Sequence, residues 1–267
     1  MSHGFDKAKA MLDGSQVYTP FPLINAVISG AQNGKIYFFG DSNPTNFFTI
    51  HKSAFSYLYM PGTVDNRKGF YSLIESDDSL PQYFHVYDAP TWLIEYCTGS
   101  HENFNCKLRT RIQLKYTKPN ISMPLIPQGY SCTRVSTENI FKLATFELDL
   151  ANRYWKSESD FLQNGFGYFI QNENGDAVSL CYSACVENAT AEIDVATMPD
   201  YRNRGLAKTA VAAFIQHCLA HNIIANWDCF EENAGSLKTA YSLGFDSILV
   251  YPFLSIFNKM KKHENHR

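Results

Sequence analysis

The sequence predicts a mixed α/β sheet in the second half of the chain, preceded by a smaller α+β domain. Of the 267 residues, 45% are hydrophobic and 18% are charged, so the chain has enough apolar side chains to bury a core. Three prolines fall within residues 117–129, and proline disfavours the interior of helices and sheets. After them, runs with strand and helix periodicity follow one another in the order β-α-β-β-β-α-β-α-β, which indicates a mixed sheet flanked by helices.

The proline-rich stretch is the expected domain boundary. We predict an N-terminal α+β domain over residues 1–125, a second domain over residues 126–258 and a polar tail over residues 259–267. The N-terminal domain has no motif with evident chemistry and no clear internal repeat. Its expected elements are a helix or hairpin arm at 66–76 and β-prone aromatic runs at 35–41, 47–62, 83–90 and 91–97.

The elements of the second half follow from periodicity and from turn residues. Ser136 or Thr137 is a suitable N-cap for the first helix, Asn174-Gly175 suits a hairpin turn, and Gly244 suits the residue after the last helix. The expected order is a strand at 129–136, a helix at 137–152, two strands within 166–188, a strand at 190–198, a helix at 205–221, a strand at 223–230, a helix at 233–243 and a strand at 247–257.

The loop that enters the helix at 205–221 has the residues of an anion site. The first N–H groups of a helix have no partner inside it, and the helix dipole makes that end positive. Gly205 and Ala207 leave these groups accessible, while Arg202 and Arg204 add positive charge. A phosphate therefore fits this loop, although a solvated turn has the same composition.

Residues 202–207 fit the pattern Q/R-x-x-G-x-G/A and thereby resemble the acyl-CoA signature of the GCN5-related N-acetyltransferases. Pro199-Asp200-Tyr201 is similar to the lead-in of that signature, and residues 233–245, with Asn233 and a terminal Leu-Gly-Phe, are similar to a second motif. Residues 227–237 further resemble the zwittermicin A resistance-type subfamily of bacteria.

The resemblance implies a fold in which the strands at 190–198 and 223–230 run parallel and splay apart around acetyl-CoA. The pantetheine amides are then expected to pair with Val195, Ala196 and Thr197. The remaining cofactor-binding residues that the resemblance implies are Arg202, Asn203, Arg204, Gly205, Leu206, Ala207 and Lys208 at the diphosphate, with Asn233 and Ser236 beside the pantetheine arm.

The implied activity is the transfer of an acetyl group to a primary amine of a small molecule by direct attack. Glu192 is the first candidate for the general base and Asp194 the second, because residues two apart on a strand share a face. Both also fit an ordinary solvent-facing alternation. The position at which relatives carry a tyrosine acid is Ala240, so Tyr241 is a candidate acid or a plain surface residue.

The amino-acid composition excludes some classes of partner molecule. A net charge of −3 disfavours a nucleic-acid partner, and the lack of a long apolar run disfavours a membrane span. Seven cysteines without a C-x-x-C pair predict reduced thiols, a cytoplasmic location and no metal site. The expected partners are acetyl-CoA and a small amine, such as an antibiotic, a polyamine or an amino-acid derivative, and the oligomeric state, a homodimer included, is left open. The alternatives are an acyl-CoA-binding regulatory module and a chain whose active part is the N-terminal domain.

Overall fold

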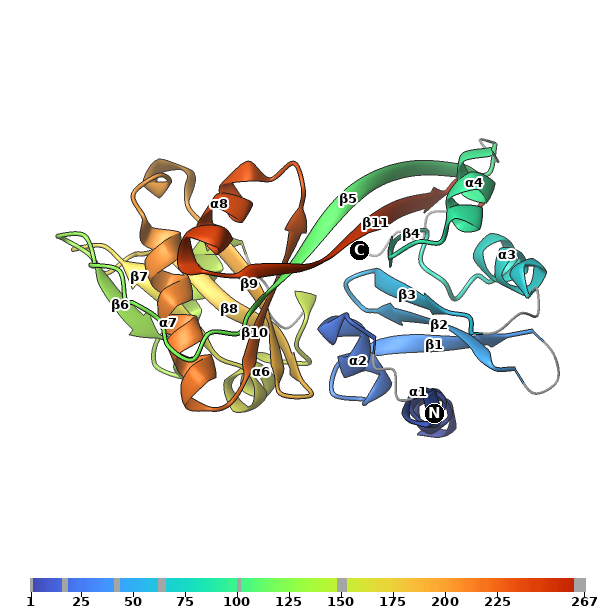
Figure 1. Cartoon of the computed structure of the whole chain (residues 1–267), viewed down its shortest axis with the longest axis horizontal. Helices are drawn as coiled ribbons and strands as arrows, with labels where there is room; N and C mark the ends of the chain where they lie inside the picture. The colour runs from blue at the N-terminus through green and yellow to red at the C-terminus, as the bar shows by residue number, and fades with distance from the viewer. Residues whose placement is uncertain are drawn as a thin grey trace. The chain divides into compact units, whose positions relative to one another are not determined.

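The computed structural model describes residues 2–15, 19–40, 44–61, 66–99, 102–147 and 153–261. Helices and strands form the mixed α+β fold that the sequence predicts (Figure 1). The chain divides into two compact units, of which unit 1 comprises residues 1–111 and 251–267 and unit 2 comprises residues 112–250. The predicted boundary at residue 125 therefore lies inside unit 2, and the C-terminal strand ends in unit 1.

Unit 1 is a sheet with flanking helices around an aromatic core. Its elements are α1 (Ser2–Ser15), α2 (Pro22–Ile28), β1 (Gly34–Phe39), β2 (Asn46–His51), β3 (Phe55–Tyr59), α3 (Arg67–Ser76), β4 (Tyr83–Tyr87), α4 (Thr91–Gly99) and parts of β5 (Phe104–Tyr116) and β11 (Asp246–Asn258). The strand order is β1-β2-β3-β4-β11, with β3 and β4 parallel and the other neighbours antiparallel. Phe48, Phe70 and Phe84 are fully buried in its core.

Unit 2 is a sheet whose two faces are covered by different parts of the chain. Its elements are β6 (Ser131–Arg134), the 3-10 helix η1 (Ile140–Phe146), α6 (Glu158–Asn164), β7 (Gly167–Gln171), β8 (Ala177–Glu187), β9 (Thr190–Thr197), the 3-10 helix η2 (Pro199–Tyr201), α7 (Leu206–Ala220), β10 (Ile224–Phe230) and α8 (Ala234–Leu243). The strand order is β5-β10-β9-β8-β7-β6. Helix α7 packs across β7, β8 and β9 (Figure 1). On the other face, Trp155 donates its indole N–H to the carbonyl of Ser183, and Phe161 packs edge-on against Tyr182.

The two units repeat one order of elements. In unit 1, the antiparallel strands β1, β2 and β3 are followed by α3, by β4 parallel to β3, and by α4. In unit 2, the antiparallel strands β7, β8 and β9 are followed by α7, by β10 parallel to β9, and by α8. The sequence shows no internal repeat, because the two copies share the order of their elements without sharing a residue pattern.

The last strand of each copy begins in its own unit and ends in the other. Residues 253–257 of β11, the strand that follows α8, pair with β4 in unit 1. The end of β5, the strand that follows α4, lies beside β10 in unit 2, where Ile112, Leu114 and Tyr116 join the hydrophobic core. The sequence does not reveal this exchange, since a strand carries no mark of the sheet that it joins.

Two expected elements differ from the structure. Residues 91–97 are predicted as a strand but lie in helix α4, because Leu93 and Cys97, at a spacing of four, form its buried stripe after Pro90. The predicted helix at 137–152 is a 3-10 helix at Ile140–Phe146, and residues 148–152 lie outside the described part of the chain.

Candidate active site

The parallel strands β9 and β10 pair over only part of their length. The register runs from Thr190 opposite Ile224 to Glu192 opposite Asn226, whereas the two strands continue to Thr197 and Phe230. Among the described residues no further pair joins these strands. On the β10 side, the backbone from Ile193 to Thr197 is therefore left without a strand partner, which agrees with the splayed strands that the family resemblance implies.

The segment Val195–Thr197 is held in place from its other side. These residues lie opposite Cys181, Leu180 and Ser179 of β8, and the hydroxyls of Ser179 and Thr197 are 2.8 Å apart. All three residues are half-buried. The strand thus has one edge fixed in the sheet and one edge with backbone groups available to a ligand.

Glu192 lies at the last paired position of β9. Its side chain is only 7% exposed, and its Oε2 accepts a hydrogen bond of 2.6 Å from Nδ2 of Asn226. Asn226 is fully buried. The neighbours Ala191 and Ile193 belong to the hydrophobic core under α7, so the alternation of a strand places Glu192 and Asp194 on the opposite face.

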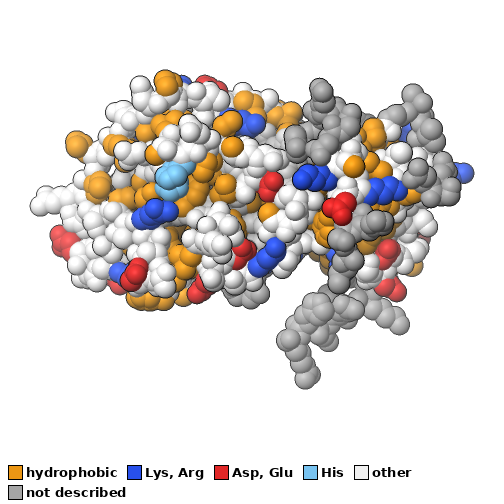
Figure 2. Space-filling view, turned by 90° about the horizontal axis from the view of Figure 1, so that it is seen from below, with side chains coloured by type: hydrophobic (Ala, Val, Ile, Leu, Met, Phe, Trp, Pro, Cys, Tyr) orange, Lys and Arg blue, Asp and Glu red, His pale blue; other side chains and the backbone are white. Residues whose placement is uncertain are grey.

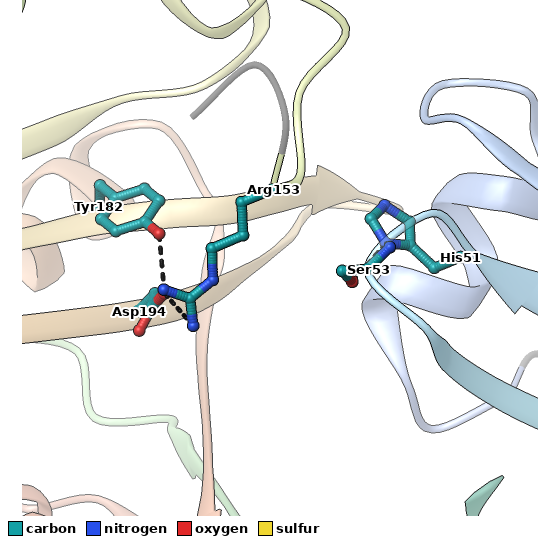
Figure 3. Close-up of polar contacts among 5 residues, drawn as sticks. All are labelled: His51, Ser53, Arg153, Tyr182 and Asp194. Carbon is teal, nitrogen blue, oxygen red and sulfur yellow. Dashed lines mark hydrogen bonds and ion pairs between the residues drawn. The ribbon is translucent and has the colours of Figure 1, made fainter. Parts of the chain in front are cut away.

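Asp194 takes part in a separate polar cluster. Its Oδ2 accepts a hydrogen bond of 2.7 Å from the hydroxyl of Tyr182 and lies 3.4 Å from a guanidinium nitrogen of Arg153 (Figure 3). Burial, with Asp194 as the next cause, raises the pKa of the Tyr182 hydroxyl well above its ordinary value. The hydroxyl is therefore a hydrogen-bond donor to this carboxylate over the physiological pH range.

The loop before α7 presents a helix N-terminus. Asn203 and Gly205 have φ angles of 61° and 79°, and the first bond of α7 runs from the N–H of Thr209 to the carbonyl of Gly205, at 3.1 Å. The N–H groups of residues 206–208 consequently have no partner within the helix. A Cβ atom added to Gly205 would meet no atom within 4 Å, so no side chain or backbone covers this position.

The two arginines of this loop are bound to it rather than free. Arg202 donates through Nε to the carbonyl of Thr197 at 3.2 Å. Arg204 donates to the carbonyl of Asp200 at 2.9 Å and to the Tyr130 hydroxyl at 3.0 Å. The guanidinium groups therefore stabilise the shape of the loop while remaining exposed.

The residues around α8 have mainly local contacts. Asn233 caps the helix by accepting a hydrogen bond of 3.1 Å from the N–H of Ser236, whose hydroxyl in turn accepts the indole N–H of Trp227 at 2.9 Å. Tyr241 is 48% exposed, and Ala240 is fully buried. Asn233 is thus the N-cap of α8. Its place beside the pantetheine arm and a role of Tyr241 as an acid stay predictions.

The sequence analysis does not select four residues that lie near the two carboxylates: Asn226, Arg153, Tyr154 and Tyr182. The only local signal is that Asn226 precedes Trp227-Asp228 on a strand that the resemblance already marks. Tyr154 is buried, and burial raises its pKa above the ordinary value, with Asp194 as the next cause and Glu192 as a smaller one. Arg153 and Tyr154 come from a stretch without periodicity, so only tertiary packing brings them to the carboxylates.

A β-bulge in β8 changes which residues share a face. In a regular strand, Cys181 and Cys185 would share a face because they are four residues apart. The register shift between Ser183 and Cys185 instead places Cys181 opposite Val195 and Cys185 opposite Glu192. Cys181 lies in the core under α7, whereas burial and the nearby Glu192 raise the pKa of Cys185. A buried neutral thiol therefore borders the Glu192 carboxylate.

The remaining features of the described residues are the distribution of surface charge, of possible metal ligands and of apolar helices. On the face shown in Figure 2, Lys and Arg side chains lie singly among Asp and Glu rather than in one basic patch. Within the described ranges, no three side chains of His, Cys, Asp or Glu form a group that could hold a metal ion. No helix in the described part of the chain is both long and apolar enough to cross a membrane.

Solved structures that are described as GCN5-related N-acetyltransferases have a similar fold. A GCN5-related N-acetyltransferase-like protein from Streptococcus suis 89/1591 has a TM-score of 0.68 at 23% identity, over 94% of this chain and 99% of that chain. A tandem GNAT protein from the clavulanic acid biosynthesis pathway has a TM-score of 0.64 at 11% identity, over 95% of this chain and 94% of that chain. At such identities the likeness shows the fold alone.

The family follows from the sequence comparison. The model of the GNAT acetyltransferase family matches residues 19–254, so this chain belongs to that family. It is 32% identical over 126 residues to the uncharacterized N-acetyltransferase YdfB of Bacillus subtilis (strain 168). That match covers 47% of this chain and 48% of YdfB, so it spans about half the length of the curated relative.

Proposed function

We propose that this protein is an acetyl-CoA-dependent N-acetyltransferase that transfers the acetyl group to a primary amine of a small molecule by direct attack. One observation carries the proposal: β9 and β10 separate directly after Glu192, on the same strand that leads to the open N-terminus of α7. Family membership supports it, because the split strands and the glycine loop lie within the matched residues.

The residues present fit the cosubstrate. The diphosphate would be held by the N–H groups of residues 203–208, where the helix dipole favours a negative charge and Gly205 adds no bulk. The pantetheine amides would pair with residues 195–197 of β9, along the edge that has no strand partner. When bound, acetyl-CoA supplies the activated acetyl group as a thioester.

Glu192 would act as the general base. The acceptor nitrogen loses a proton to this carboxylate, directly or through one water molecule, and forms the new bond to the acetyl carbon as the thiolate leaves. We prefer Glu192 to Asp194 because the Asp194 carboxylate is already held by Tyr182 and Arg153. Glu192 has instead an amide donor and lies at the point where the strands part.

The route of the proton to the leaving thiolate is a second part of the proposal. Tyr241 is half exposed on α8, so water has access to the same region, and we assign protonation of the thiolate to water. Turnover of Tyr241→Phe measures this directly. A loss of more than about tenfold would return the role of acid to the phenol.

The acceptor that we infer is a cationic amine. Glu192 and Asp194 lie on one face of β9, and Asp228 is expected on the same face of β10 by alternation. Carboxylates attract an ammonium group. The resemblance to the zwittermicin A resistance-type subfamily extends the candidates to amine-bearing antibiotics, beside polyamines and amino-acid derivatives.

The test is acetylation of an amine panel by the purified chain. Release of free thiol from acetyl-CoA is followed with a chromogenic thiol reagent, and the mass of each amine is checked for one added acetyl group. Polyamines, aminoglycosides, an aminopolyol antibiotic and amino-acid amides make up the panel, with the matching alcohols as controls. Binding of acetyl-CoA without turnover of any amine would overturn the proposal in favour of an acyl-CoA-binding regulatory module.

A further inference from the structure

Asn226 and Glu192 form a hydrogen-bonded pair at the end of the parallel register. They are direct neighbours across β10 and β9, and Asn226 Nδ2 lies 2.6 Å from Glu192 Oε2. This distance is short for an N–H···O bond, and a carboxylate is an acceptor that forms short bonds. Asn226 is fully buried and Glu192 is 7% exposed, so the amide lies behind the carboxylate rather than in solvent.

The pair determines the orientation of the amide and leaves one of its atoms without a partner. An ionised carboxylate only accepts hydrogen bonds, so the NH₂ group of Asn226 must face Glu192. Asn226 Oδ1 then points away, and among the described residues it has no hydrogen-bond partner. A buried acceptor without a partner is unfavourable for folding, and an apolar β-branched residue would suit this strand better.

The repeated topology provides an internal comparison. In unit 1 the parallel register of β3 and β4 also has three positions, and the third places Tyr57 opposite Tyr87. The corresponding third position in unit 2 holds Glu192 and Asn226. The fold therefore accepts a pair of aromatic rings at this position, and the carboxylate–amide pair occurs in the unit that carries the glycine loop.

We propose that Asn226 is a positioning residue for N-acetylation, which orients the Glu192 carboxylate toward the opening between β9 and β10 and keeps it ionised. The inference rests on the proposed function. The N–H donor stabilises the charged form of the carboxylate. The protein thereby retains an amide whose unpartnered Oδ1 lowers its folding stability. Glu192 is thereby ready to take a proton from the acceptor amine.

Other groups also act on the Glu192 carboxylate and are part of the test. Cys185 faces it from β8, and Tyr154 approaches it from the stretch before α6. Asp194, with its partner Arg153, lies two residues further along β9. The thiol and the phenol both have pKa values raised by burial, so neither titrates in the acidic range that reports on Glu192.

The experiment compares the pH dependence of kcat/KM in Asn226→Val, Asn226→Asp and wild type. The acidic limb is the fall of kcat/KM at low pH. Asn226→Val removes the donor and Asn226→Asp replaces it by a second carboxylate, and both are expected to move this limb at least about one pH unit upward. At a given pH on the limb, kcat/KM then falls about tenfold. The alkaline plateau is expected to stay within about threefold, because a deprotonated amine needs no base. Asn222→Asp, the same change at an exposed position, is the matched control and should leave the limb in place.

Two further measurements separate this inference from the proposed function. Glu192→Gln should leave only the rise of kcat/KM with pH that the acceptor amine itself sets. The double variant with Asn226→Val should show no additional shift, since Asn226 acts through Glu192. Carboxyl-¹³C NMR titration of the glutamates reports on Glu192 without any acetylation. A Glu192 titration and a pH profile that Asn226→Val leaves unchanged would overturn the inference. A wild type without acetylation, but with a shifted titration in the variant, would overturn the proposed function alone.

Discussion

The hydroxyl of Tyr182 donates a hydrogen bond of 2.7 Å to Asp194, the residue directly opposite it on the neighbouring strand. Arg153 approaches the same oxygen at 3.4 Å, so two donors occupy this carboxylate. The two acidic residues of β9 therefore have different surroundings, although the sequence presents them as equivalent. Asp194 is held by a cation and a hydroxyl, and Glu192 by an amide at the opening of the strands.

This difference predicts unequal effects of the two amide substitutions. Glu192→Gln is expected to lower kcat/KM about 10²- to 10⁴-fold at neutral pH, because the general base is lost. Asp194→Asn is expected to lower kcat/KM less than about tenfold, since the proposed base Glu192 is still present. Steady-state kinetics from pH 6 to about 10 measures both losses and also tests whether the loss in Glu192→Gln is that of a general base. The deficit of Glu192→Gln should shrink as the acceptor amine deprotonates by itself, and a larger loss in Asp194→Asn would exchange the two roles.

Gly205 offers a direct test of the diphosphate site. Its positive φ and open surroundings predict that Gly205→Trp weakens acetyl-CoA binding at least about 100-fold by filling the loop. Gly175→Trp is the matched control, because Gly175 also has a positive φ, with only the end of Lys142 near its Cβ position. Calorimetry measures the acetyl-CoA affinity of both variants, and their melting temperatures show whether each is still folded. Equal affinity in the two would show that the cosubstrate binds elsewhere.

The repeat raises the question of a second cosubstrate site, and the structure predicts one site per chain. In unit 1, β4 ends at Tyr87, the last paired residue, so the strand does not continue past the register. Phe21 stacks on the Tyr87 ring at 4.4 Å and lies 5.5 Å from the Tyr57 ring. Calorimetric titration should give a stoichiometry of one acetyl-CoA. A second site that persists in Gly205→Trp would contradict this expectation.

The exchanged strand predicts that unit 2 depends on residues from before the predicted boundary. Leu114 of β5 is fully buried in the core of unit 2. Leu114→Ala is expected to lower the free energy of unfolding by about 2–5 kcal/mol. Leu125→Ala, at a side chain that is 95% exposed, should change it by less than about 0.5 kcal/mol. Urea unfolding of the two variants measures both values, and equal values would place β5 outside the core.

His217 predicts a loss of stability in acid. Its ring stacks on Phe166 with centroids 4.1 Å apart, and burial, with positive charge from His221 and Arg134, lowers its pKa to about 4. The unfolded chain takes up this proton near pH 6.5, whereas the folded protein resists it until about pH 4. Stability should thus fall as the pH drops from 6.5 to 4 and be independent of this group above that window. His217→Phe retains the stacking and should therefore reduce the slope of the unfolding free energy against pH between 4 and 6.5. His85 has a pKa that is also lowered to about 4, so it accounts for part of the slope that remains.

Much of unit 2 follows from local sequence, because its helices and strands have strong periodicity and distinct end signals. Gly244 has the positive φ expected after α8, and Asn233 caps that helix. The glycine loop is also correctly placed before α7. Unit 1 is less predictable, since its aromatic residues favour strands even where packing selects a helix, as in α4.

The sequence by itself determined the family, the loop that fits a diphosphate and the two acidic candidates on one strand, because these depend on short stretches of adjacent residues. Only the tertiary structure decided which carboxylate is held by an ion pair, that Asn226 donates a hydrogen bond to the other, and in which unit β5 and β11 end. The physical reason is that hydrogen bonds between strands and the burial of side chains join residues far apart in the chain, and such contacts leave no periodic trace in the sequence.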